Sequence, residues 1–140
     1  MVNKELVFKK LKELEFYLAR LNKYKGITPW ELENDLEKLW IIERGLQICI
    51  QIVLDVGNHV LAEKGISVEQ YKDIFLELGK HDVLPRKFAE KIKGMAGLRN
   101  IIVHEYASIN LDLLSGIVNN SLGDFKKFAE YIMISISADE

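Results

Sequence analysis

The chain has 140 residues, of which 49% are hydrophobic and 29% are charged, and its formal net charge is −2. This balance is typical of a globular protein, and it excludes an intrinsically disordered chain and a uniformly basic nucleic-acid binder. A chain of this length is expected to form one domain, spanning residues 1–140.

Three features of the sequence predict a cytoplasmic protein that does not enter a membrane. The single cysteine, Cys49, lies in an apolar run and cannot form an internal disulfide, which fits a reducing compartment. Residues 1–16 carry charges throughout, unlike a signal peptide. The longest apolar stretch, residues 41–60, is too polar for a membrane span because it contains Glu43, Arg44, Gln47, Gln51 and Asp55.

Apolar residues recur at intervals of three and four in the first half of the chain, a spacing that predicts amphipathic helices. The first helix is expected over residues 3–24. The sequence TPWE at residues 28–31 then supplies a capping threonine, a proline suited to the first helical position and a glutamate that completes a capping box. The second helix can extend from there to Lys64, with a bend at Gly45 or Gly57.

The second half of the chain continues the helical pattern. The sequence SVEQ at residues 67–70 predicts the start of a short third helix. Pro85 opens a fourth helix with weak points at Gly94 and Gly97, and a fifth is expected over residues 111–135, capped by the asparagine before it. Since no alternating strand pattern competes, the sequence predicts an all-α bundle of four or five helices.

Charge is distributed unevenly along the chain. Residues 28–43 carry a net charge of about −4 and residues 80–99 one of about +4. Such segments are usually solvated helix faces, but the basic one also provides the local attraction that a ligand bearing phosphate groups requires.

A polar stripe interrupts the apolar second helix. On a helix its members fall within a sector about 120° wide; they are Arg44, Gln47, Gln51, Asp55, Asn58 and His59. Two interpretations remain open. The stripe is either the narrow wet edge of a buried helix, or it faces another polar group from the chain or from a second copy. Asp55, four residues before His59, would also be placed to set the charge of that imidazole.

The sequence GLRNIIVHEY at residues 97–106 places several polar side chains on either side of a short, strongly apolar run. On an ideal helix Arg99 and His104 differ in direction by about 140°, whereas Arg99 and Tyr106 differ by about 20° and Asn100 lies one turn before His104. Arg99 and His104 therefore meet on one phosphate only if the arginine reaches around, the helix breaks, or a second subunit contributes its own copy.

The residue types of this segment suit cleavage of a phosphodiester in RNA. A histidine can transfer protons to and from the reacting oxygens, and an arginine can stabilise the extra negative charge at phosphorus. A purely structural role for the same residues is the alternative. Neither a cofactor nor a metal is expected, because His59 and His81 lack the spacing of a zinc site and no cysteine cluster supports one.

The stretch RNIIVHEY resembles the signature of the HepT-like branch of the HEPN superfamily, in which arginine, four residues, histidine, one residue and tyrosine follow one another. The similarity extends to three further stretches. ERGLQICIQIVLDVGNHVLAEKG resembles the central helix of that family, YKDIFLELGKHDVLP its next helix and turn, and FAEKIKGMAGLRNIIVHEY its motif helix.

The resemblance implies an up-down helical bundle of HEPN type that forms a homodimer, with the two motifs at a cleft between the subunits. It also implies a metal-independent endoribonuclease toxin of a type VII system, silenced when an MntA-like minimal nucleotidyltransferase antitoxin transfers AMP to the motif tyrosine. Carried over by position, Arg99 and His104 are the catalytic pair and Tyr106 is the modified residue. Supporting polar roles fall to Asn100, Asp55, Asn58 and His59.

Two functional classes remain open at this point. The first is a ribonuclease toxin with RNA as its substrate, and the second is a HEPN module without catalysis that binds a nucleotidyltransferase partner or a nucleotide. The presence of both Arg99 and His104 favours the first class. The sequence contains no recognisable RNA-reading module, so it does not name the target RNA.

Overall fold

The computed structural model describes residues 3–104 and 110–138, with side chains for all of these except residues 100–104. Every regular element within these residues is a helix, which confirms the predicted all-α class. The helices in chain order are α1 (Lys4–Asn22), α2 (Pro29–Asn34), α3 (Leu36–Glu63), α4 (Tyr71–Lys80), α5 (Arg86–Ile92), α6 (Met95–His104), α7 (Leu111–Asn120) and α8 (Leu122–Ala138). In the described part of the chain, no helix combines the length and the apolar character needed to cross a membrane.

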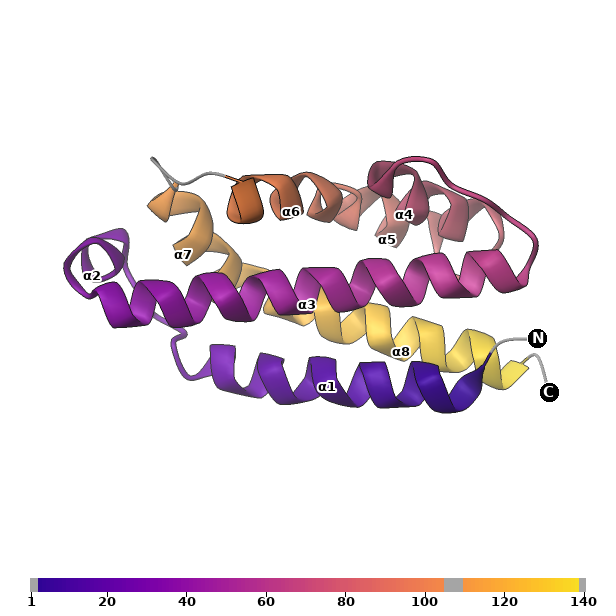
Figure 1. Cartoon of the computed structure of the whole chain (residues 1–140), viewed down its shortest axis with the longest axis horizontal. Helices are drawn as coiled ribbons and strands as arrows, with labels where there is room; N and C mark the ends of the chain where they lie inside the picture. Colours follow the sequence, from indigo (N-terminus) through magenta and orange to yellow (C-terminus); the bar gives the residue numbers. More distant parts are fainter. Residues whose placement is uncertain (1–2, 105–109, 139–140) are drawn as a thin grey trace.

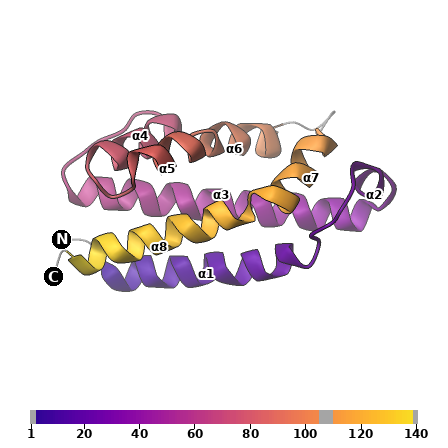
Figure 2. The same cartoon turned by 180° about the vertical axis from the view of Figure 1, so that it is seen from behind.

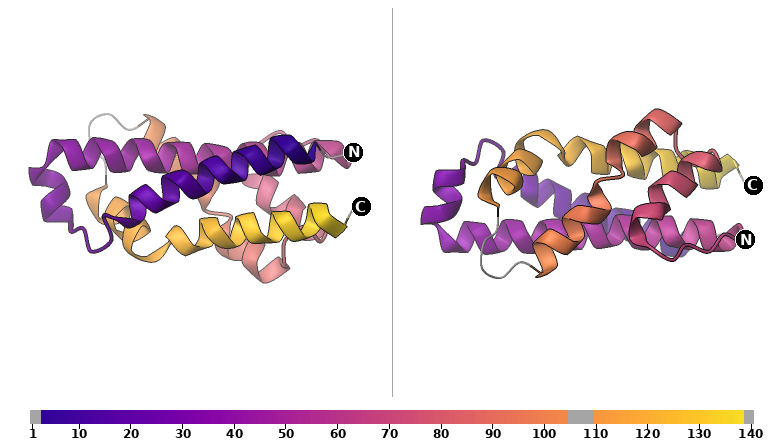
Figure 3. Two further views of the ribbon diagram at one scale, coloured as in Figure 1. Left: turned by 90° about the horizontal axis from the view of Figure 1, so that it is seen from below. Right: turned by 90° about the horizontal axis from the view of Figure 1, so that it is seen from above.

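The long helix α3 lies at the centre of the molecule (Figure 1). Helices α1 and α8 run along one side of it, and α4, α5 and α6 cover the other side. Seen from behind, α7 lies next to α2 at the end where α3 begins (Figure 2). Helix α1 begins and α8 ends at the opposite end, and the two helices run side by side along α3 (Figure 3, left).

The core forms where the apolar stripes of these helices meet α3. Four positions of α1 are buried at intervals of three, four and seven, which is the helical period that the sequence shows. On α8, Phe128 packs against Phe75 of α4 with the ring centroids 6.3 Å apart and the planes at 80°, an edge-to-face arrangement. Each such buried side chain contributes on the order of 2 kcal/mol to folding.

The glycines of α3 allow neighbouring helices to approach closely. The helix runs without interruption through Gly45 and Gly57, and a bend at either stays a prediction. A Cβ atom added at Gly45 would lie 2.8 Å from Leu21 of α1, and one at Gly57 would lie 2.7 Å from Ile74 of α4. The two glycines therefore give α1 and α4 the space to pack against α3.

Three of the five predicted helices are each divided into two. The predicted second helix is interrupted at Asp35, whose carboxylate accepts a hydrogen bond from the backbone N–H of Lys38 at 3.2 Å and so starts α3 anew. The fourth is interrupted at Gly94 and the fifth at Ser121, which lies between α7 and α8. Side-chain capping and turn geometry override the apolar period at these points.

A long-range clamp joins α7 to the turn between α1 and α2. Gly26 in this turn has φ of +98°, a conformation that favours glycine. The backbone N–H of Gly26 donates a hydrogen bond to Oδ1 of Asn119, and Nδ2 of Asn119 donates to the carbonyl oxygen of Ile27 at 2.9 Å. One side chain therefore satisfies two backbone groups of the turn and holds α7 against it.

Replacing Gly57 by alanine tests the close packing of α3 against α4. The new methyl group would meet Ile74, and overpacking of this kind costs about 1–3 kcal/mol, more than the helix propensity that alanine gains. We expect a lower free energy of unfolding in urea. Gly116→Ala in α7 is the matched control, because no described residue lies within 4 Å of its added Cβ and the gain in propensity remains. Equal stabilisation of both variants would contradict the packing argument.

Candidate functional site

Arg99 lies at the centre of the candidate site, on the face of α6 that packs against α3. Its Nε–H donates a hydrogen bond to Oε1 of Gln51 at 2.9 Å. Nε2 of Gln51 in turn donates to Oδ1 of Asp55 at 2.8 Å. The polar stripe of α3 thus contacts the motif helix at Gln51, as the second interpretation expected, whereas Arg44, Asp55 and Asn58 are exposed, as the first expected.

The guanidinium of Arg99 also lies over the ring of Tyr71, with Cζ 4.7 Å from the ring centroid. Tyr71 is the first residue of α4, and 42% of it remains exposed. A cation held over an aromatic face is attracted to the electrons of the ring. Sequence analysis missed Tyr71, because no local pattern indicates that the start of α4 meets α6.

The backbone of α6 excludes one of the three ways in which Arg99 and His104 could meet on one phosphate. The helix continues from Arg99 to His104, so the separation of about 140° between the two directions holds and a break in the helix does not bring them together. The side chains of Asn100 and His104 lie outside the described ones, and Tyr106 lies outside the described residues. Their predicted roles therefore stay predictions.

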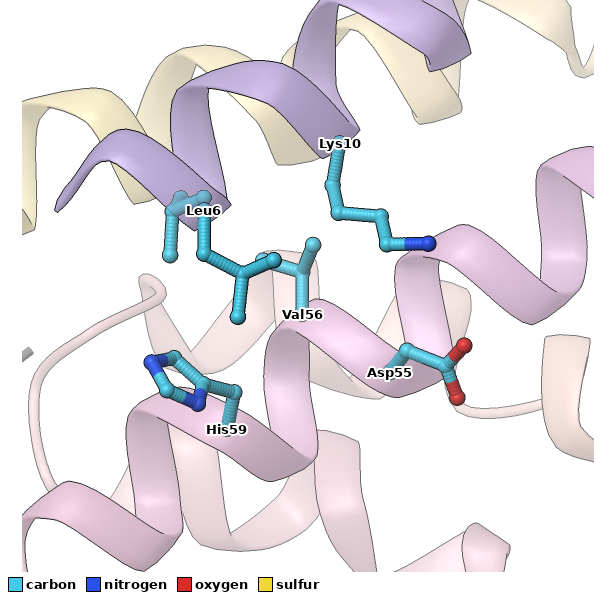
Figure 4. Close-up of a pocket in the computed structure, with 6 residues that line it drawn as sticks. Leu6, Lys10, Asp55, Val56 and His59 are labelled. Atoms are coloured by element: carbon cyan, nitrogen blue, oxygen red, sulfur yellow. The ribbon is translucent and has the colours of Figure 1, made fainter. Parts of the chain in front are cut away.

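The expected pairing of Asp55 with His59 is absent from the site. Asp55 bonds to Gln51, whereas Nε2 of His59 accepts a hydrogen bond from the backbone N–H of Asn3 at 3.4 Å. The two side chains point in different directions from α3 (Figure 4). Asn58 is exposed on the same helix. Of the supporting residues whose side chains are described, Asp55 is the one that hydrogen bonds connect to Arg99, through Gln51.

Two small hollows lie in the described part of the chain, and Arg99 lines neither of them. A hollow of about 50 Å³ lies between α1 and α3, lined by Leu6, Val7, Lys10, Asp55, Val56 and His59 (Figure 4). A second one, of about 210 Å³, lies between the α5–α6 segment and the α7–α8 segment. Sites that enclose small molecules usually span about 300–1,000 Å³, so neither hollow is sized to enclose a nucleotide.

The basic segment before the motif is less positive in the structure than in the sequence. Lys80 pairs with Glu77 at 3.3 Å, Lys93 with Glu90 at 2.8 Å and Lys91 with Asp124 at 3.1 Å. Exposed pairs of this kind contribute little to stability, but each places a carboxylate beside a lysine. Arg99 differs because its contacts in the described part of the chain are a neutral amide and an aromatic ring. Across the same residues, no three histidine, cysteine or carboxylate side chains are grouped as a metal site.

The sequence profile of the family described as "Ribonuclease HepT-like" matches residues 14–132. The chain belongs to the HepT-like ribonuclease family. It is 33% identical over 129 residues to the mRNA nuclease HepT of Shewanella oneidensis, an alignment that covers 91% of this chain and 96% of that protein. It is 30% identical over 118 residues to the tRNA nuclease HepT of Aphanizomenon flos-aquae, covering 83% of this chain and 80% of that protein.

The fold of this HepT-like chain also matches a solved structure. The Shewanella oneidensis HEPN toxin, described as tri-AMPylated and in complex with MNT antitoxin, superposes with a TM-score of 0.81 at 25% identity. The match covers 91% of this chain and 96% of that chain. The predicted helical bundle of HEPN type is therefore confirmed.

Glu43 is an unusual carboxylate on α3, one position before the polar stripe. Its Oε1 atom is buried and has no hydrogen-bond partner among the described residues. Burial raises the pKa of this carboxyl group above its ordinary value. Because the folded chain binds the proton more tightly than the unfolded chain, the contribution of Glu43 to stability falls as pH rises through the interval between the two pKa values.

Glu43→Gln should therefore raise the free energy of unfolding at neutral pH, by less than about 1 kcal/mol, because it removes a charge that burial disfavours while solvent still screens part of the side chain. The gain should shrink as pH falls through the raised pKa of Glu43 and be lost below the ordinary pKa of glutamate. Urea unfolding at pH 4 and pH 7.5 measures this difference, with Glu69→Gln at an exposed loop position as the control. A variant that is less stable than the wild type at neutral pH would show that the Glu43 carboxylate is satisfied.

Proposed function

We propose that this chain is the toxin of a HepT/MntA-like pair and cleaves RNA in the cytoplasm without a metal ion. The observation that carries the proposal is Arg99, held on the surface by Gln51 and Tyr71 within the R-x4-H-x-Y motif of a HepT-like ribonuclease chain. The relatives named as mRNA and tRNA nucleases support RNA as the substrate class.

The proposed reaction assigns one task to each member of the pair. The 2′-oxygen attacks phosphorus while its proton passes to a base, and the bond from phosphorus to the 5′-oxygen breaks as that oxygen takes up a proton. His104 is suited to one of these proton transfers because an imidazole titrates near neutral pH. Arg99 stabilises the additional negative charge that develops on the phosphate oxygens in the transition state.

A second copy of the chain is proposed to complete the site. Arg99 and His104 lie on different faces of one continuous helix. Two subunits can bring an arginine and a histidine to the same phosphate more simply than one subunit can. Trp40 is 60% exposed, and its position eleven residues before Gln51 places both within about 20° on one face of α3. Trp30 of α2 is 70% exposed near this end of the face. Large apolar side chains exposed in this way are typical of an interface.

Regulation by a minimal nucleotidyltransferase antitoxin is the remaining part of the proposal. The related HEPN toxin described as tri-AMPylated, in complex with its MNT antitoxin, supports modification as the means of silencing. Tyr106 lies seven residues after Arg99 in the sequence and is the proposed acceptor. AMP attached there would hold a phosphate near Arg99 at a high effective concentration and compete with RNA.

The cleavage proposal predicts activity that persists in EDTA and is lost in Arg99→Ala and in His104→Ala. Loss of the charge partner or of the proton-transfer group should lower the rate about a hundredfold or more. Cleavage of a labelled RNA is the measurement, with circular dichroism to show that each variant is folded. If the folded wild type bound RNA or its partner but cleaved no RNA, the chain would be a binding module instead.

The shared site predicts a homodimer of about twice the 16.1 kDa chain mass in light scattering. Trp40→Glu should produce monomers, whereas Ile134→Glu on α8, where the wild-type side chain is 66% exposed, should not. Mixing the inactive Arg99→Ala and His104→Ala chains should restore about a quarter of the activity, because half of the dimers are mixed and each then has one complete site. No recovery on mixing, with subunit exchange verified, would place both residues of each site on one chain.

The modification proposal predicts that Tyr106→Phe retains cleavage but escapes the antitoxin, since the ring remains and the acceptor oxygen is gone. Intact-mass spectrometry after incubation with the partner nucleotidyltransferase and ATP should show added AMP on the wild type alone. Co-expression should leave the variant toxic. Equal labelling of Tyr106→Phe would place the modified residue elsewhere.

A further inference from the structure

We propose that Gln51 and Tyr71 are positioning residues that aim the guanidinium of Arg99 at the scissile phosphate. This inference rests on the proposed ribonuclease function. Gln51 holds the Nε edge of the group at 2.9 Å, and Tyr71 supports its face with Cζ 4.7 Å from the ring centroid. The two restraints come from α3 and α4, so the direction of an α6 side chain is set by two other helices.

The neighbouring Asp55 determines which way the Gln51 amide faces. A carboxylate can only accept hydrogen bonds, so the amide nitrogen of Gln51 must point toward Asp55, at 2.8 Å. The amide oxygen is then directed at Arg99, which can only donate. Asp55 therefore acts on the arginine through one intervening side chain and without a direct ion pair.

A neutral partner leaves the positive charge of Arg99 available. A carboxylate at position 51 would form a charge-assisted pair with the guanidinium and compete with the phosphate. Glutamine restrains the same edge through a single hydrogen bond and adds no charge. The ring of Tyr71 likewise attracts the cation without neutralising it.

The two restraints hold Arg99 by its Nε and by one face of the guanidinium, not by its terminal nitrogens. No described residue bonds to its two terminal nitrogens. These nitrogens form the fork that suits two oxygens of one phosphate. Because Nε and one face of the group are already held, little rotational freedom remains to be lost when the phosphate binds.

The first experiment removes each restraint separately. Gln51→Leu and Tyr71→Leu should each lower the cleavage rate at saturating RNA about ten- to a hundredfold, because a misplaced group loses transition-state contacts. Binding of RNA should change less than about threefold. Tyr71→Phe keeps the ring and should cleave within about twofold of the wild type. Gln70→Leu is the matched control, since Gln70 precedes Tyr71, is exposed and makes no capping hydrogen bond with its side chain.

A second experiment tests whether Gln51 acts through Arg99. Arg99→Lys removes the Nε–H, so adding Gln51→Leu to it should produce no further loss of rate. Nitrogen-15 NMR gives a readout that does not depend on activity. The Nε–H signal of Arg99, identified by its disappearance in Arg99→Lys, should exchange slowly with solvent in the wild type and rapidly in Gln51→Leu.

The outcomes separate the inference from the function on which it rests. If Gln51→Leu and Tyr71→Leu cleave at the wild-type rate, or if Gln51→Leu slows Arg99→Lys as much as it slows the wild type, the positioning role is overturned and the ribonuclease function stands. If the folded wild-type dimer cleaves no RNA, the proposed function is wrong and the positioning role is wrong with it.

Discussion

The burial of α3 is the constraint on which the rest of the structure depends. This helix is apolar over most of its circumference, so it must be covered from several directions at once. Helices α1 and α8 cover it on one side and α4 to α6 on the other, and its two glycines set how closely α1 and α4 approach. On the polar stripe of this helix, Gln51 accepts a hydrogen bond from Arg99 and donates one to Asp55.

The helical class and the order of the helices could be predicted from the sequence because amphipathic periodicity is a local signal. The divisions at Asp35 and Ser121 could not, since the apolar period continues across both positions. A cap or a turn ends the helix at these positions. The free energy that a cap contributes is only about 1 kcal/mol, similar to what continuing the helix would contribute. A difference that small is decided by tertiary packing.

The candidate site was only partly predictable for a related reason. Arg99 stands in a contiguous motif and was recognised directly, and Gln51 and Asp55 were marked by their position on a polar stripe. Tyr71 was missed because its role depends on contact with Arg99, a residue 28 positions later in the sequence. Asn119 was missed for the same reason, since its partners lie 92 and 93 positions earlier.

The clamp made by Asn119 has a consequence for synthesis on the ribosome. The turn after α1 presents a backbone N–H at Gly26 and a carbonyl at Ile27, both bound by a side chain from the last quarter of the sequence. During translation the turn after α1 lacks these two hydrogen bonds until α7 has left the exit tunnel. A truncated or growing chain therefore lacks the hydrogen bonds that hold α7 against this turn. The turn becomes ordered late in the synthesis of each chain.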